Sequence, residues 1–125
     1  VCSSDLWGQS LVDFASRAAI CLNLHAENEI SWEPRVQMLL SMGAFVISEP
    51  ITPNDWLKPG QHFIEVKGKD EFKEAFRYYI NNSNERMDFA DNACKYVRSV
   101  LDSKQNIKKL ILDIEAGKYN KIRHK

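Results

Sequence analysis

The stretch SWEPRVQMLLSMGAFVISEP, residues 31–50, decides the fold. Pro34 suits the first turn of a helix, because a missing N–H removes no hydrogen bond there. The pattern predicts a helix that begins at Pro34, runs through Met42 and stops at Gly43. The apolar run AFVIS, residues 44–48, follows at once and predicts a strand that is covered on both faces. A helix followed directly by a buried strand is typical of parallel α/β sheets.

The segments around this stretch extend the pattern. The apolar run AAICLNLH, residues 18–25, predicts another buried strand, and HFIEV, residues 62–66, predicts a third. Residues 8–17 predict a short amphipathic helix, and residues 26–33 and 49–61 predict loops. Three apolar stripes predict three further helices; they are Phe72, Phe76, Tyr79 and Ile80, then Met87, Ala90, Cys94, Val97 and Leu101, then Ile107, Leu110, Ile111 and Ile114. We therefore expect an α/β fold with a Rossmann-like, doubly wound parallel sheet, flanking helices and a helical C-terminus.

Length and charge limit the function classes. A chain of 125 residues is one domain at most. Its 17 basic and 17 acidic residues balance, which argues against a nucleic-acid-binding protein. No run of about 18 apolar residues is present, so we expect no transmembrane segment. Three cysteines without a C-x-x-C pair indicate a reducing, cytoplasmic setting, and Cys21 and Cys94 read as small core residues.

The two ends of the chain read differently from its middle. VCSSDL, residues 1–6, can be back-translated as GTG TGC TCT TCC GAT CT, which resembles a sequencing adapter read in frame. We expect these residues to be non-native; the alternative is a genuine helix start capped by Ser3, Ser4 or Asp5. The domain then spans residues 7–117, and the basic tail KYNKIRHK, residues 118–125, reads as a solvated helix end.

Parallel sheets bind ligands outside the carboxyl ends of their strands. At that edge the helix that begins at Pro34 directs free N–H groups and a positive dipole end outward, which suits phosphate. Arg35 lies in this first turn and fits a diphosphate, or alternatively forms a salt bridge with Glu29 or Glu33. His25 ends the first strand at the same edge and is either a ligand-binding or a structural residue.

Other polar residues near this edge are less informative. Ser31 caps the helix or touches a ligand. Glu49 and Asp55 are placed as general bases are, but no spacing selects either of them. Histidines at 25, 62 and 124 make no metal pattern, and there is no phosphate-binding loop or nucleophile elbow. The residues alone thus indicate an α/β domain with an anion-binding helix end, without a metal or cofactor.

Four stretches in sequence carry a family resemblance. They are ICLNLH, then PRVQMLLSMGAFVIS, then LKPGQHFIEVKGKDEF, then AFRYYINNSNERMDFADNACKYV. Their order and spacing from about Ala18 to Leu112 resemble the C-terminal half of group 1 glycosyltransferases, closest to the branch of spore-maturation-type glycosyltransferase-like proteins. The resemblance implies a GT-B architecture, in which two Rossmann-like domains face each other across a cleft. This chain would be the domain that binds the nucleotide-sugar donor, and the N-terminal domain that binds the acceptor would be missing.

The resemblance also implies a chemistry and a site. Catalysis in this fold is metal-independent, and hydrogen-bond donors and helix dipoles stabilise the negative charge of the departing diphosphate. The donor is a substrate and not a cofactor; the acceptor, a glycan, lipid or protein, is unknown. Donor contacts would come from His25, Ser31, Arg35 and position 38, and no catalytic residue is assigned.

Position 38 departs from the family pattern. Family members usually carry a Glu three residues after the Arg, where it binds the ribose hydroxyls, and often another Glu eight residues before that one. Here these positions are Met38 and Ile30. A methionine is a poor acceptor, so a ribose would leave hydroxyls unpaired at a cost of about 1–3 kcal/mol. Alternatively, Met38 packs into the core beside Val36, Leu39 and Leu40.

Three functions follow from these observations. The first is a retaining-type glycosyltransferase, seen here as its donor-binding half. The second is a degenerate, non-catalytic transferase-like binding module, which Met38 and Ile30 favour. The third is an unrelated flavodoxin-like binding or signalling domain. Such a domain requires an acidic cluster or a phosphate-binding loop after the first strand, and neither is clear here. Arg35, the loop lengths and the strand that follows Pro59 and Gly60 favour the first.

Overall fold

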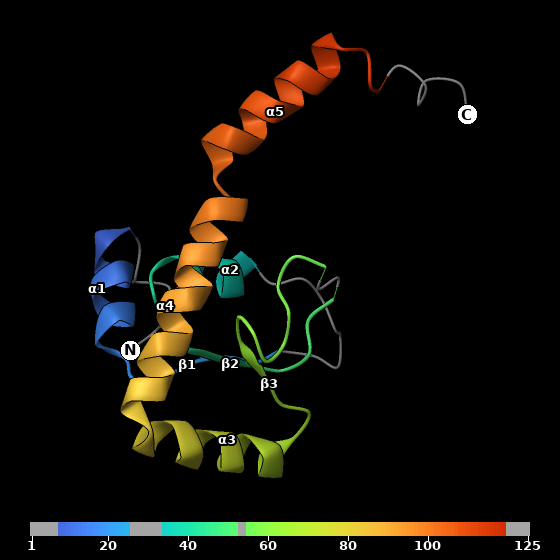
Figure 1. The fold of residues 1–125 in the computed structure, drawn as a ribbon. Coiled ribbons are helices and arrows are strands. Elements are labelled where there is room, and N and C mark those ends of the chain that lie inside the picture. The colour runs from blue at the N-terminus through green and yellow to red at the C-terminus, as the bar shows by residue number, and fades with distance from the viewer. Residues whose placement is uncertain (1–7, 26–33, 53–54, 120–125) are drawn as a thin grey trace.

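The computed structural model describes residues 8–25, 34–52 and 55–119. Over these residues the chain forms a parallel three-stranded sheet flanked by helices and ends in a helix, so the predicted fold class is confirmed (Figure 1). The elements in chain order are α1 (Gln9–Arg17), β1 (Cys21–Asn23), α2 (Pro34–Ser41), β2 (Val46–Ser48), β3 (Ile64–Glu65), α3 (Lys69–Asn81), α4 (Ser83–Val100) and α5 (Ser103–Glu115).

The sheet has the order β1-β2-β3, and both pairings are parallel. The register pairs Cys21 with Val46 and Asn23 with Ser48, and it pairs Ser48 with Glu65. Asn23, Ser48 and Glu65 therefore form a polar row across the sheet where the strands end. Such a row at the carboxyl ends is where a parallel sheet meets its ligand.

The strands are shorter than predicted, and β1 is less covered. The central strand β2 is fully buried, as the run AFVIS predicts. In contrast, Leu22 and Leu24 in and after β1 are 40% and 56% exposed, so a strand buried on both faces over 18–25 is wrong for these two residues. The reason is position: within the described sheet β1 pairs with β2 alone and lies at an edge.

Helices cover both faces of the sheet. Along β2 successive side chains point to opposite faces, so Val46 joins one apolar cluster and Ile47 the other. The first cluster also contains residues of α1 and α2, and the second is packed by α3 (Figure 1). α4 supplies both, with Ala90 in the second cluster and Ala93 and Val97 in the first. The doubly covered sheet that the sequence predicts is therefore present.

The turn between α2 and β2 matches the prediction closely. Gly43 has a φ of 81°, a backbone conformation that side chains disfavour. Its N–H donates to the carbonyl of Leu40 at 3.0 Å, and the N–H of Ala44 donates to that of Leu39 at 3.1 Å. These bonds satisfy carbonyls that the helix end leaves open.

The described part of the connection from β2 to β3 contains no helix. It is nevertheless held to the body, because Ile51, Leu57 and Phe63 are buried in the first cluster. His62 adds a polar anchor: its Nδ1 accepts from the N–H of Lys58 at 2.9 Å, and its ring stacks on Tyr96 of α4 with centroids 3.9 Å apart.

The last helices differ in how they pack. On α3, Phe72 and Tyr79 of the predicted stripe pack against the second cluster, whereas Phe76 and Ile80 are partly exposed. α5 leaves the body at the end of α4 and extends away from it (Figure 1). No residue of α5 is buried. None of the helices in the described ranges combines the length and apolar character that a membrane crossing requires.

Candidate functional site

The carboxyl edge of the sheet begins with a buried polar pair. Asn23 ends β1 and Ser48 ends β2, and both side chains are fully buried. The Nδ2 amide of Asn23 donates to Oγ of Ser48 at 3.0 Å. The Ser48 hydroxyl in turn donates to the carbonyl of Glu49 at 2.6 Å. The pair thus ties the ends of two strands together beneath the edge.

One atom of this pair has no partner. Among the described residues, Oδ1 of Asn23 is buried without a hydrogen bond. If the amide were flipped, Nδ2 would be the unpaired atom instead of Oδ1, because Ser48 offers Asn23 a single oxygen. Buried polar groups nearly always form a hydrogen bond, so an unpaired one needs an explanation.

His25 lies just beyond β1 and is bound to the segment that follows β2. Its Nε2 lies 2.7 Å from the carbonyl oxygen of Pro50, so Nε2 carries the hydrogen and donates. Its backbone N–H donates to Oε2 of Glu49 at 2.6 Å. His25 is at the edge that the sequence predicts, but these bonds give it a positioning role there. Glu49, which the sequence suggests as a possible general base, instead accepts a hydrogen bond from the backbone just after β1.

Arg35 occupies the first turn of α2 and is exposed. Within the described part of the chain it forms no ion pair. The alternative partners Glu29 and Glu33 lie outside the described residues. Because the first N–H groups of a helix have no intrahelical acceptor, Arg35 adds a cation to an end that is already electropositive.

Met38 does not join the core. The core positions of α2 are Val36, Leu39 and Leu40, whereas Met38 is 38% exposed. The alternative of a core-facing methionine is therefore wrong. Met38 lines an open cavity of about 500 Å³ between α2 and the junction of α4 with α5. The other lining residues are Pro34, Gln37, Ser41, Val97, Arg98, Leu101, Asp102 and Ser103.

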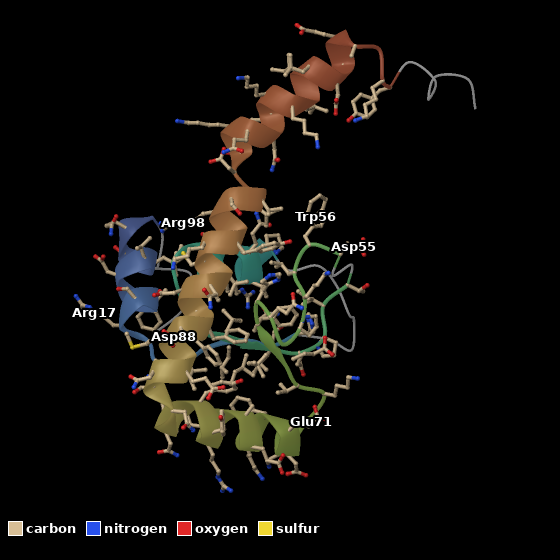
Figure 2. All side chains as sticks on the ribbon, in the orientation of Figure 1. Arg17, Asp55, Trp56, Glu71, Asp88 and Arg98 are labelled. Carbon is tan, nitrogen blue, oxygen red and sulfur yellow. The ribbon has the colours of Figure 1, made fainter. Side chains whose placement is uncertain are left out.

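Arg98 is a cavity residue that the sequence analysis missed. It projects from α4 (Figure 2), and its Nε donates to the carbonyl of Ser41, the last residue of α2, at 3.0 Å. The cation lies at the negative end of the α2 dipole, which is a favourable place for it. Nothing in the sequence near Arg98 indicates this contact, because Ser41 is 57 residues away.

The remaining candidates divide into two groups. Ser31 and Ile30 lie outside the described residues. Asp55 projects with Trp56 from the outer side of the segment after β2, away from α2 (Figure 2), and it is exposed. Among residues 8–25, 34–52 and 55–119, no hydrogen bond or ion pair joins His25 to Arg35 or Met38. Over the same ranges no three His, Cys, Asp or Glu side chains gather as a metal site would require.

The cysteines are less buried than the core residues that the sequence predicts. Cys21 and Cys94 are free thiols and are half-buried. Cys21 packs against the first cluster, and burial raises the pKa of its thiol, so it stays protonated and is a poor nucleophile. Sγ of Cys94 lies 3.5 Å from the Ser41 carbonyl.

The start of α2 and the cavity beside it offer hydrogen-bond donors and a helix dipole. This part of the chain is therefore suited to binding an anionic or polar ligand.

Comparison with known proteins identifies a family. No curated protein and no solved structure matches the chain significantly. A family described as glycosyl transferase-like matches residues 2–111 of the 125. That match spans the sheet, the cavity and most of α5, and it supports glycosyl transfer as the general function. The chain belongs to the glycosyl transferase-like family.

Proposed function

We propose that this chain is the donor-binding domain of a GT-B glycosyltransferase and that it binds a nucleotide-diphosphate sugar. The acceptor, a glycan, lipid or protein, would bind to a second domain across the cleft. The observation that carries the proposal is the start of α2, which presents the exposed Arg35 without an ion pair among the described residues. Membership of the glycosyl transferase-like family supplies the reaction class.

The diphosphate would lie at the start of α2. Free backbone N–H groups and the positive dipole end favour a phosphate there, and the guanidinium of Arg35 can bind two of its oxygens at once. In the reaction the bond between the anomeric carbon and the diphosphate oxygen breaks while the oxygen of an acceptor hydroxyl forms the new bond, and the proton of that hydroxyl passes to the departing diphosphate. The helix end and Arg35 would stabilise the negative charge that the departing diphosphate gains.

The nucleoside would lie along the cavity beside α2. Met38 forms part of its wall, one turn after Arg35. The group 1 glycosyltransferases that the sequence resembles usually carry a ribose-binding Glu at this position. Gln37 and Asp102 line the same cavity and offer polar groups for hydroxyls. Binding by these residues in place of a Glu would be weaker, because the methionine thioether accepts hydrogen bonds poorly.

The proposal is tested by titrating the chain with uridine and guanosine diphosphate sugars in a calorimeter. We expect binding of one donor class, and we expect Arg35→Ala to weaken it about tenfold. Arg77→Ala removes the same charge from the exposed surface of α3 and should leave binding unchanged. No binding of either donor at millimolar concentration, or equal binding by both variants, would contradict the proposal.

A second candidate function is a degenerate, non-catalytic transferase-like module. Met38 at the cavity wall favours it, because the family's ribose-binding carboxylate is missing there. Such a module would bind a nucleotide sugar or a glycan without turning it over. An assay of donor hydrolysis and transfer separates the two functions: donor binding without release of nucleoside diphosphate, in the protein together with an acceptor domain, would establish the module.

A further inference from the structure

α5 carries an uncovered apolar stripe. Ile107, Leu110, Ile111 and Ile114 follow the spacing of one helix face, and each is between 48% and 57% exposed. The helix extends beyond the body, and its side chains project into open space (Figures 1 and 2). Isolated amphipathic helices of this length are marginal in water, so such a stripe needs a surface to cover it.

We propose that this stripe binds the same stripe of a second copy of the chain in an antiparallel helix pair. The spacing is self-complementary about a point between Leu110 and Ile111. When two copies of α5 run in opposite directions around that point, Ile107 of one lies level with Ile114 of the other. Leu110 of one then lies level with Ile111 of the other, so all the apolar layers meet.

The charges beside the stripe support the antiparallel direction. Lys104, Lys108 and Glu115 are separated by 4, 7 and 11 residues, spacings that place them on one flank of the stripe. In the antiparallel pair Glu115 of one copy lies level with a point midway between Lys104 and Lys108 of the other. Both copies make this contact, so two acidic groups are each flanked by two basic ones.

A second copy fits this face better than an anionic lipid surface does. Within α5 the basic residues are Lys104, Lys108 and Lys109, and the acidic ones are Asp113 and Glu115, so the charge of the helix is nearly balanced. Helices that lie on membranes carry a strongly basic polar face. Here Glu115 borders the apolar stripe itself, where it would repel anionic headgroups.

The test measures self-association of the full chain by sedimentation equilibrium. We expect the mass to rise from 14.4 kDa toward twice that value as the protein concentration increases. Ile111→Lys, at the centre of the stripe, should raise the dissociation constant at least about tenfold. Gln105→Lys places the same charge on the opposite side of α5 and should change it little. No residue of α5 is buried in the body, so both variants keep the fold, which circular dichroism checks.

Charge reversal tests the direction of the pair. Glu115→Lys should weaken association several-fold, and adding Lys104→Glu and Lys108→Glu to it should restore association. Glu115→Lys favours the isolated helix, because it places a cation at its C-terminus. A loss of association in Glu115→Lys therefore reports on the pair and not on helix stability.

Three results would overturn the proposal. The first is a chain that stays monomeric up to about 1 mM, where even weak pairs form. The second is equal association by Ile111→Lys and Gln105→Lys. The third is binding to phosphatidylglycerol vesicles without self-association, which would assign the stripe to a membrane. None of these measurements involves a sugar donor, so they stand or fall independently of the proposed function.

Discussion

The side-chain amide of Asn23 donates a hydrogen bond to the hydroxyl of Ser48 across the ends of β1 and β2, while its own Oδ1 stays buried without a partner among the described residues. The pair therefore holds an incomplete set of hydrogen bonds at the carboxyl edge of the sheet. Removing one member of the pair should cost more stability than the hydrogen bond itself contributes, because the remaining polar group stays buried without a partner.

Ser48→Ala should destabilise the domain by about 1–3 kcal/mol, because both polar atoms of the Asn23 amide would then be buried and unpaired. Asn23→Leu removes the unpaired oxygen together with the hydrogen bond, in a side chain of similar size. We expect it to cost less than Ser48→Ala. Urea denaturation of the two variants measures the difference, and a larger loss in Asn23→Leu would show that Oδ1 is satisfied in solution.

His62 should make stability depend on pH. Burial, aided by the charge of Lys58, lowers the pKa of His62 below its ordinary value of 6.5. The unfolded chain therefore takes up this proton first as the pH falls, so stability is complete above about 6.5 and is lost as the pH falls toward the folded pKa. Thermal denaturation across this range should show the loss.

His62→Gln keeps an acceptor for the N–H of Lys58 but does not titrate. Its unfolding temperature should vary less than that of the wild type between pH 6.5 and 5, and the difference between the two curves isolates His62 from the other histidines. Parallel curves would assign the acid sensitivity to other groups.

Gly43 and Gly68 offer a matched pair of substitutions. An added Cβ would meet no atom within 4 Å at either glycine, so neither change creates a clash. Gly43 has a φ of 81°, and Gly43→Ala should cost about 1–2 kcal/mol through backbone strain alone. Gly68 is the N-cap of α3 and is extended, with a φ of −178°, so Gly68→Ala brings no backbone strain. It replaces only a favourable N-cap residue, and we expect it to cost less than Gly43→Ala. Equal stabilities by chemical denaturation would contradict the conformational argument.

Met38→Glu introduces the residue that group 1 glycosyltransferases, which the sequence resembles, usually carry at this position. Because Met38 lines an open cavity and is partly exposed, the variant should fold with nearly unchanged stability. We expect it to bind the nucleotide-sugar donor roughly ten times more tightly, since a carboxylate accepts hydrogen bonds from ribose hydroxyls. Calorimetry with Met38→Gln as a neutral comparison measures the gain; unchanged affinity in both would place the ribose elsewhere.

Local patterns predicted the centre of the fold well. The helix from Pro34 to Ser41, the stop at Gly43 and the buried strand β2 follow from side-chain periodicity and backbone preference within one continuous stretch. The parallel order follows because each strand reads as apolar and no hairpin turn joins them. Exposure along β1 was not predictable, because it depends on whether another strand lies beside it.

The candidate site was only partly predictable for a similar reason. The sequence predicts that His25 follows the first strand and that Arg35 lies in the first turn of the next helix, and both are found in these positions. Whether either binds a ligand stays a prediction. The contacts of Arg98 with Ser41, and of His62 with Tyr96, join segments far apart in the chain. A side chain's distant partner leaves no periodic trace in its own neighbourhood, so such contacts become visible only in three dimensions.

α4 contributes Ala90 to the cluster on one face of the sheet and Ala93 and Val97 to the cluster on the other. Because the single helix α4 packs in both clusters, neither cluster can lose its packing while the other keeps it. The domain should therefore melt in one cooperative step, and the amide hydrogens in the middle of α4 should exchange with solvent only through global unfolding.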